Sequence, residues 1–377
     1  MTETLFWVSA FFVLYPYVGY PLALWLAGLF APARVPPGEL EEWPVVTLLI
    51  AVYNEEAVIA AKLENSLALD YPRDRVEIVV ASESTDGTNA IVESYGGHGV
   101  RLCAFSQRRG KPALLYSTVP LARGEIVVFS DANAFYEPQA LKKLVRHFAD
   151  PRLGCVSGRL VYRTAAGAAA GESLYWRYEQ WVKRLESRLG ALLGANGSIF
   201  ALRKSLYRPL DEVRGDDFEL PVRALLEGFT VILEPEARSW EDGSASVRAE
   251  FRRHVRIVSW FLESAIQLFR EAWRRRRLRL GWQIVSHRLL RWTAPHFLLL
   301  LLAASVLLEG ELYRVALAAQ LGFYAAALLG WRLDARRSAL PAWLRLPYYF
   351  CALHAAVLVG FWRGVSLPPA AAWEKVR

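Results

Sequence analysis

Cysteine and methionine are scarce in this chain of 377 residues, which has three cysteines and one methionine. Cys103, Cys155 and Cys351 are far apart and lack the spacing of a metal or redox motif. This pattern excludes a disulfide framework as the feature that holds the fold together. We predict that the three cysteines are ordinary buried thiols and that the soluble part of the protein lies in a reducing compartment.

The glycine-rich signatures of common nucleotide-binding folds are also missing. No Gly-x-Gly-x-x-Gly follows the first predicted strand, and Gly96-Gly97-His98-Gly99 precedes a strand. There is no Walker loop either. These absences argue against a dinucleotide-binding domain and against a P-loop domain.

Acidic side chains are few in the segment where arginines are concentrated. Between Phe251 and Arg291 there are eleven arginines and only two acidic residues, Glu263 and Glu271, in a chain of net charge +8. Such a basic run suits either a nucleic acid or the anionic headgroups of a membrane. Because apolar segments adjoin the run, we predict membrane contact and no nucleic-acid partner.

Charged residues are missing from four long segments. Leu5–Phe30 has 26 residues without a charge, which is enough to cross a bilayer. Trp292–Leu308, Val315–Trp331 and Leu346–Trp362 have 17 residues each without Asp, Glu, Lys or Arg, and Trp and Tyr cluster at their ends. The alternative for the first segment is a signal peptide, but Glu3 and the missing basic residues before it favour an uncleaved anchor.

The distribution of basic residues predicts a multi-pass cell-membrane protein with a defined orientation. The basic block before Trp292 and the loop Arg332–Arg345 are expected on the cytoplasmic side, with the turn Glu309-Gly-Glu311 outside. The soluble domain then faces the cytoplasm. A full crossing by the last segment would place Arg363 outside, so we expect this segment to be re-entrant or half-inserted.

The chain divides into four predicted parts. Residues 1–33 form an N-terminal transmembrane helix and residues 44–250 a cytoplasmic domain of the α/β class. Residues 251–291 are predicted to be basic amphipathic helices in the membrane interface, although an ordinary core helix gives the same pattern. Residues 292–377 form a C-terminal membrane region with about three hydrophobic segments.

Apolar runs alternate with helical patterns in the α/β domain. This alternation predicts a mixed, mainly parallel sheet flanked by helices, with right-handed crossovers. Asp86 is expected to cap the second helix. The expected strands are 45–52, 76–81, 100–105 and 126–129, and the expected helices are 56–69, 88–95 and 113–121.

The stretch Gly124–Asn133 is the centre of the predicted domain. Its apolar run Ile126–Phe129 is typical of a strand buried on both faces, and the run ends in Asp131 and Asn133. Ligands of open α/β sheets bind at the carboxyl ends of the strands, and two oxygen side chains there suit a hard divalent cation. From these residues alone an Asx turn or a helix cap is an equal explanation.

Seven short motifs follow one another along the chain. They are Val52-Tyr-Asn-Glu-Glu56, Ser84-Thr-Asp-Gly-Thr88, Gly110-Lys111, Ser130-Asp-Ala-Asn133, Gly194-Ala-Asn-Gly197, Asp216-Asp-Phe218 and Phe251-Arg-Arg-His-Val-Arg-Ile257. Each motif alone is weak, but the ordered set resembles family 2 glycosyltransferases of the GT-A fold. The resemblance is to the membrane-embedded bacterial type, similar to cellulose synthases, poly-N-acetylglucosamine synthases and ceramide glucosyltransferases, and the tail Trp373-Glu-Lys375 is similar too.

The resemblance implies transfer of a hexose, with inversion, from a nucleotide sugar, usually a UDP-sugar. A departing diphosphate concentrates negative charge, which a divalent cation (Mg²⁺ or Mn²⁺) and basic groups must neutralise. Asp131 and Asn133 are the implied metal ligands. Asn133 is neutral where many relatives have aspartate, so metal binding is expected to depend heavily on the diphosphate.

The resemblance also implies a set of donor-binding residues at the strand ends. Tyr53 and Glu55 match the contacts to base and ribose. Glu83 is the nearest carboxylate in a second loop that is one residue shorter than in the relatives. Arg109 and Lys111 are placed for nucleotide or phosphate contact, although a solvated loop lysine remains the alternative for Lys111.

Asp217 matches the position of the family's general base, with Asp216 in a supporting role. Inversion by single displacement requires a base that takes the proton of the acceptor hydroxyl. Two acidic residues at a helix start are equally typical of caps that favour the helix dipole. Gly194-Ala-Asn-Gly197 is predicted to be a turn, either where the backbone approaches sugar or acceptor or as a plain hairpin turn.

The arginine-rich motif carries Arg253 and Arg256, and Arg256 is expected to clamp the diphosphate because a guanidinium meets phosphate oxygens bidentately. Processive relatives have Gln-x-x-Arg-Trp, and this chain lacks the glutamine and the tryptophan. We therefore predict transfer of one or a few sugars to a lipid or lipid-linked acceptor. The alternatives are a processive polysaccharide synthase and a catalytically silent scaffold of an envelope assembly.

Overall fold

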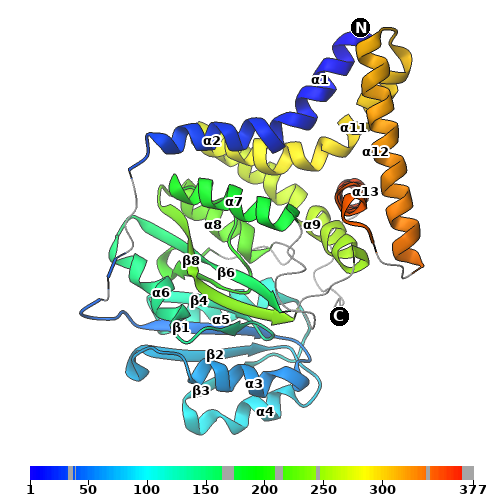
Figure 1. The fold of residues 1–377 in the computed structure, drawn as a ribbon. Coiled ribbons are helices and arrows are strands. Elements are labelled where there is room, and N and C mark those ends of the chain that lie inside the picture. The colour runs from blue at the N-terminus through cyan, green and yellow to red at the C-terminus, as the bar shows by residue number, and fades with distance from the viewer. Residues whose placement is uncertain are drawn as a thin grey trace.

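The computed structural model describes residues 1–32, 37–38, 40–163, 174–208, 215–242, 247–336 and 340–366. The tail motif Trp373-Glu-Lys375 lies outside these residues. Figure 1 shows the soluble domain and the apolar helices of the described part of the chain.

An eight-stranded sheet forms the centre of the soluble domain, in the order β3-β2-β1-β4-β7-β6-β8-β5. The first four strands along the chain are parallel to one another, and the predicted mainly parallel sheet is confirmed. Figure 1 shows the sheet with helices packed on both faces. These four strands are β1 (Val46–Val52), β2 (Val76–Ser82), β3 (Val100–Ala104) and β4 (Ile126–Asp131).

Strand β1 is apolar throughout because both of its faces are covered. Leu48 and Ile50 belong to a cluster that includes Ile59 of helix α3 (Glu56–Leu67). Leu49 points to the opposite face, in a cluster with Leu115 of helix α5 (Lys111–Thr118). Since successive side chains of a strand alternate between faces, a central strand between two helical layers needs an unbroken apolar run.

The second half of the sheet is mixed. Strand β7 (Phe200–Arg203) is antiparallel to β4 and to β6 (Leu153–Arg163), whereas β6 and β8 (Thr230–Asp242) are parallel. The short strand β5 (Phe135–Tyr136) closes the edge beside β8. The other helices of the domain are α4 (Thr88–Ser94), α6 (Ala140–Val145), α7 (Leu174–Arg188) and α8 (Asp216–Leu226).

Four helices of the described chain are long and apolar enough to cross a membrane: Thr2–Leu29, Leu278–Leu307, Glu311–Ala335 and Ala342–Ser366. The first two are each interrupted by a π-helical turn, at Tyr15–Gly19 and at Val285–Leu289. A π-turn bends the helix axis. The elements are α1 (Thr2–Leu14), α2 (Tyr20–Leu29), α10 (Leu278–Ile284), α11 (Leu290–Leu307), α12 (Glu311–Ala335) and α13 (Ala342–Ser366).

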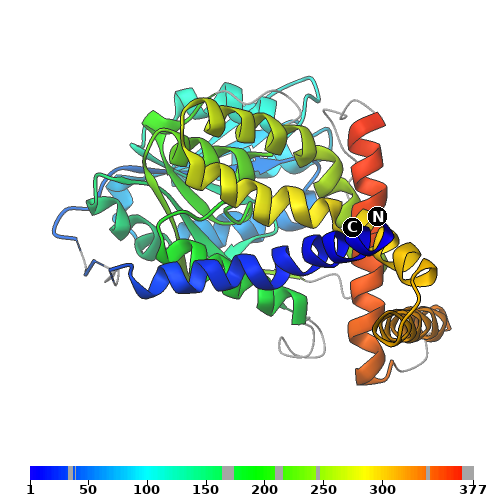
Figure 2. The ribbon, with the colours of Figure 1, turned by 90° about the horizontal axis from the view of Figure 1, so that it is seen from above.

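The bends turn the apolar helices in different directions. In Figure 1, α2 lies across the top of the soluble domain, whereas α1 bends away from it toward the end of α12. Helix α12 runs along the page in Figure 1 while α13 is seen end-on, and Figure 2 shows the reverse. Helices α12 and α13 therefore run across each other.

Helix α9 (Val247–Arg274) packs against the protein through one face, and the position of residues 251–291 in the membrane interface stays a prediction. Its apolar residues Val258, Leu262 and Ala265 are buried in a cluster that also holds residues of α8, α10 and α13. Trp273, near the helix end, is 65% exposed. Packing against neighbouring helices accounts for the apolar face of α9, and a membrane-facing helix would show the same periodicity.

Candidate active site at the strand ends

The carboxyl ends of β1, β2 and β4 lie side by side. Ala51 is opposite Asp131 in the register of β1 and β4, and Val52 is opposite Ser82 in that of β1 and β2. The polar residues that follow these strands are consequently brought to one edge of the sheet. This is the edge at which open α/β sheets bind ligands.

Lys111 joins the two acidic segments that the sequence singled out. Its ammonium nitrogen lies 3.0 Å from Oδ1 of Asp131 and 3.1 Å from Oδ2 of Asp216. Burial alone lowers the pKa of Lys111, but Asp131 and Asp216 outweigh it and hold the pKa above its usual value. The lysine is thus charged, and the end of β4 and the start of α8 lie within reach of one ammonium group.

Asp217 differs from Asp216 because its carboxylate forms no ion pair within the described chain. Among the residues that the structure describes, no side chain or backbone group donates a hydrogen bond to it. Burial, followed by the charge of Asp216, raises the pKa of Asp217 to about 6, against the opposing effect of Lys111. A carboxylate with a pKa near neutrality is suited to accept a proton from an alcohol.

The turn Gly194-Ala-Asn-Gly197 wraps around Asp217. The backbone N–H of Ala195 donates to the carbonyl of Asp217 at 2.7 Å, and a Cβ on Gly197 would lie 3.3 Å from Oδ2 of Asp217. The N–H of Ile199 donates to the carbonyl of Asn196 at 2.9 Å, which closes the turn. The glycines therefore leave room beside the carboxylate of Asp217.

Glu83 holds the loop that presents Lys111. Its two carboxylate oxygens accept the backbone N–H groups of Arg109 and Gly110 at 2.8 and 2.9 Å, and the residue is 5% exposed. Gly110 has a φ of 93°, a conformation that favours glycine. Because both oxygens face the backbone, Glu83 is placed to position Arg109 and Lys111.

Tyr53 stands at the end of β1 beneath an arginine that the sequence reasoning did not select. The guanidinium carbon of Arg108 lies 3.9 Å from the centre of the Tyr53 ring. Asn54, with a φ of 52°, donates its N–H to Oγ of Ser84 at 2.9 Å, which ties the loops after β1 and β2 together. Glu55 follows as the residue immediately before helix α3.

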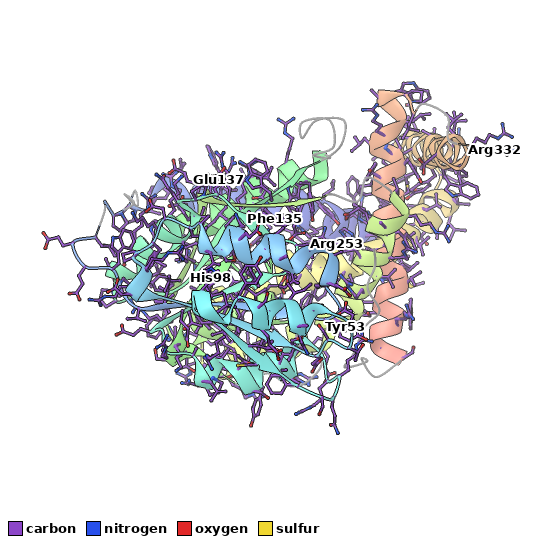
Figure 3. The ribbon with its side chains drawn as sticks, turned by 90° about the horizontal axis from the view of Figure 1, so that it is seen from below. Tyr53, His98, Phe135, Glu137, Arg253 and Arg332 are labelled. Carbon is purple, nitrogen blue, oxygen red and sulfur yellow. The ribbon has the colours of Figure 1, made fainter. Side chains whose placement is uncertain are left out.

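Arg253 comes from helix α9 and reaches the same side of the domain. Its Nη1 donates to the hydroxyl of Tyr162 at 2.8 Å and lies 3.4 Å from Oε1 of Glu250. Figure 3 shows Tyr53 and Arg253 on the side of the sheet domain that faces α13, whereas His98 lies away from it. The guanidinium of Arg253 is thus held in place by Tyr162 and Glu250.

Arg256 lies about one helical turn after Arg253 on α9. The charges of Asp217 and Asp131 both act on its guanidinium. Burial and the neighbouring charge of Arg253 lower the pKa of Arg256 to about 10, while Asp217 and Asp131 act in the opposite direction. This value keeps the guanidinium charged at neutral pH. Arg256 therefore adds positive charge to a site that already contains Lys111.

The residues at the end of β4 fit a divalent cation only in part. Asp131 keeps one oxygen free of Lys111, and Asn133 offers an amide oxygen that makes no hydrogen bond within the described chain. Oxygen ligands of this kind suit Mg²⁺ or Mn²⁺. The described residues contain no group of three or more His, Cys, Asp and Glu side chains that could hold a metal ion. Further ligands would have to come from a bound diphosphate.

Lys62 is a residue of this site that the sequence reasoning missed. Its side chain is fully buried, donates to the carbonyl of Ala134 and lies 4.2 Å from the centre of the Tyr136 ring. Burial lowers the pKa of Lys62 to about 7, although Asp131 raises it. The sequence did contain a signal for this residue. Lys62 lies three residues after Ile59, on the apolar face of the predicted helix, where a buried charge is unusual.

A buried polar network between the soluble domain and the apolar helices was also missed. Tyr20 of α2 donates to Glu186 of α7 at 2.6 Å, and Nδ1 of His287 lies 2.5 Å from the same carboxylate oxygen. Arg291, about one helical turn after His287, pairs with Glu179, about two turns before Glu186 on α7. Charged residues within an apolar helix usually have partners, and His287 and Arg291 carried that signal.

Comparison with known proteins agrees with this architecture. Residues 47–210 match the family model described as glycosyl transferase family 2. The beta-monoglucosyldiacylglycerol synthase of Synechocystis is 28% identical over 252 residues, which are 62% of this chain and 50% of that protein. The poly-beta-1,6-N-acetyl-D-glucosamine synthase of Staphylococcus aureus is 24% identical over 216 residues, 55% of this chain and 52% of that protein. The chain spans about half the length of the curated relatives it matches.

One solved structure resembles nearly the whole chain. A mannosyltransferase from Pyrobaculum calidifontis, in complex with GDP-mannose and Mn²⁺, superposes with a TM-score of 0.73 at 23% identity. The similarity covers 97% of this chain and 99% of that chain, and it includes the GT-A sheet. Residues 47–210 thus resemble glycosyltransferase family 2, and the chain has the GT-A fold.

Proposed function

We propose that this protein is a membrane-anchored, metal-dependent, inverting hexosyltransferase. It would move a hexose from a nucleotide-diphosphate sugar, UDP-linked in this proposal, to a lipid or lipid-linked acceptor at the cytoplasmic membrane face. The observation that carries the proposal is the position of Lys111 between Asp131 and Asp216, with the uncommitted carboxylate of Asp217 next in the chain. This arrangement would put the residues that bind the diphosphate and the residue that accepts the proton in one site.

The donor would lie along the ends of β1, β2 and β4. Tyr53 and Glu55 would contact the nucleoside, Lys111 and Arg256 the diphosphate, and Asp131 with Asn133 the cation. Glu83 would act through the backbone of Arg109 and Gly110, which it holds. A bound cation supplies charge neutralisation for the leaving diphosphate. Arg253 would support Arg256 from the preceding turn of α9.

Asp217 would act as the general base, with Asp216 holding Lys111 beside it. The Asp217 carboxylate takes the proton of the acceptor hydroxyl while that oxygen bonds to the anomeric carbon from the face opposite the diphosphate. This geometry gives inversion. Two observations support a lipid acceptor. The chain is similar to a protein named beta-monoglucosyldiacylglycerol synthase, and four of its described helices are long and apolar enough to cross a membrane.

The variant Asp217→Asn is expected to lose transfer while it still binds the donor. A missing general base costs roughly 10²- to 10⁴-fold in turnover. Sugar transfer is measured with purified protein in lipid across UDP- and GDP-sugars, with and without a chelator, and nucleotide binding is measured by calorimetry. Near-normal turnover in the variant would remove the assignment of Asp217.

A second candidate is a processive polysaccharide synthase, which the likeness to poly-N-acetylglucosamine synthase favours. The length of the product made from a radiolabelled donor separates the two, because a processive enzyme gives long chains at low turnover. Absence of donor binding in the presence of Mg²⁺ or Mn²⁺ would instead favour a silent scaffold.

A further inference from the structure

Two cations beside Asp217 belong to none of the seven sequence motifs. Lys183 lies on α7, and Arg288 lies in the π-helical turn between α10 and α11. Both act electrostatically on the Asp217 carboxylate and oppose the rise of its pKa that burial causes. Neither forms an ion pair with a described carboxylate within 4.0 Å, so Asp217 does not neutralise them by direct contact.

Arg288 has unused hydrogen-bonding capacity. Its guanidinium carbon lies 5.2 Å from the centre of the Phe218 ring, and its Nε is buried without a hydrogen-bond partner among the described residues. A Cβ on Gly194 would lie 2.8 Å from Nη2 of Arg288, so this glycine makes room for the guanidinium. A buried N–H without an acceptor costs free energy that a bound anion would recover.

Lys183 also forms only a weak hydrogen bond within the described chain. In the described chain its ammonium donates to the carbonyl of Ala195 at 3.5 Å, at the long limit of a hydrogen bond. Burial lowers the pKa of Lys183 and the nearby charge of Arg288 lowers it further, against the opposing charges of Glu179, Asp217 and Glu186. An anion between Lys183 and Arg288 would relieve the repulsion between them.

The two cations approach Asp217 from the side of the apolar helices. Lys111 engages Asp131 and Asp216 at the strand ends, where the donor diphosphate is proposed to bind. Helix α7, which carries Lys183, packs on α2, and Arg288 belongs to the apolar helix Leu278–Leu307. A lipid acceptor would reach Asp217 from this side.

We propose that Lys183 and Arg288 form an anion subsite that binds a phosphate group of the lipid acceptor, next to the hydroxyl that receives the sugar. The inference rests on the proposed function and narrows its acceptor to a phosphate-bearing lipid. The acceptor hydroxyl gives its proton to Asp217, and its oxygen bonds to the anomeric carbon. The bond from that carbon to the donor phosphate breaks, and the nucleoside diphosphate leaves with the electron pair. The acceptor phosphate keeps its charge throughout.

The first test is binding of a water-soluble headgroup. Calorimetry with the full-length protein saturated with UDP and Mn²⁺ compares sn-glycerol 3-phosphate, glycerol and inorganic phosphate. We expect glycerol phosphate to bind and glycerol not to bind, with affinity falling about tenfold or more in Lys183→Met and in Arg288→Met. Arg184→Met, which removes an exposed charge from the adjacent position of α7, is the matched control and should bind normally.

The second test is transfer in phosphatidylcholine nanodiscs that contain either phosphatidylglycerol or diacylglycerol. Phosphatidylglycerol should be the better acceptor, and the Lys183 and Arg288 variants should raise its KM while the Kd for UDP is unchanged. Lys183→Arg, which keeps the charge, should restore transfer if the methionine variant folds poorly.

Several results would overturn the assignment of Lys183 and Arg288 to the phosphate of a lipid acceptor. These are no binding of glycerol phosphate to the unmodified chain, equally tight binding of inorganic phosphate, or diacylglycerol as the better acceptor. Weaker UDP binding in the variants would assign the two cations to the donor and also overturn it. Failure of the proposed function would be seen separately, as absence of donor binding by the unmodified chain.

Discussion

Asp217 is the residue whose protonation decides whether the proposed reaction proceeds. A base must be ionised to accept a proton, and burial beside Asp216 raises the pKa of Asp217 to about 6. We therefore expect kcat/KM to fall by about tenfold for each pH unit below this value and to level off above it. The measurement is a pH profile of kcat/KM for sugar transfer from about pH 5 to 8.

The variant Asp216→Asn provides the internal check on this profile. Removing the neighbouring negative charge lowers the pKa of Asp217, so the acidic limb of the profile should move to lower pH even where overall activity declines. A limb that stays at the same pH in this variant would mean that another group controls the reaction.

The sequence located the motif residues of this site but not the buried cations around them. Asp131, Lys111 and Asp217 lie at the end of a strand or the start of a helix, and such positions can be placed from local pattern. Lys62 has only a weak local signal, its place on the apolar face of a predicted helix, and the position of Arg288 depends on which elements pack together. Lys62 became apparent from its burial and its hydrogen bond to Ala134, and Arg288 from a buried Nε that has no hydrogen-bond partner among the described residues.

At the scale of elements, strands buried on both faces were the most predictable. The expected strand 76–81 is observed as Val76–Ser82, because an unbroken apolar run is required between two helical layers. Strand β6 was not expected. Its register against β8 shifts between Leu153 and Cys155 and again between Ser157 and Arg159. Such irregularities interrupt the alternation by which a strand is recognised.

The packing of α13 on α9 gives a prediction at this scale. A Cβ on Gly360 would lie 2.7 Å from the carbonyl oxygen of Val255 and 2.9 Å from Cβ of Val258. We expect Gly360→Ala to lower the free energy of unfolding by about 1–3 kcal/mol, because the two helices must separate. Thermal unfolding of the purified protein in detergent measures the change.

Gly322 of α12 is the matched control, since a Cβ there would meet nothing within 4 Å. Alanine is a better helix former than glycine, so Gly322→Ala should leave the melting temperature unchanged or raise it slightly. Equal effects of the two substitutions would mean that α9 and α13 are not in the close contact described above.

At the scale of the whole molecule, the crossing of α12 and α13 bears on how the protein sits in a membrane. Exposed apolar side chains occur on both helices, among them Leu328 and Trp331 of α12 and Trp343 and Trp362 of α13. If α12 stands upright in the bilayer, α13 runs along the membrane plane, since the two helices cross (Figures 1 and 2). Such a helix would keep Arg363 on the cytoplasmic side, in agreement with the distribution of basic residues.

Thiol labelling distinguishes a helix along the surface from a helix across the bilayer. Single cysteines at Trp343 and Trp362, in a chain whose native cysteines are replaced by alanine, should react with a membrane-impermeant reagent from the same side of sealed vesicles. Glu309→Cys and Arg336→Cys lie just before and just after α12. They should react from opposite sides of the membrane and so calibrate the assay. If positions 343 and 362 also react from opposite sides, α13 crosses the bilayer. The active site would then be held at the membrane by a span, since α13 packs on the helix that carries Arg256.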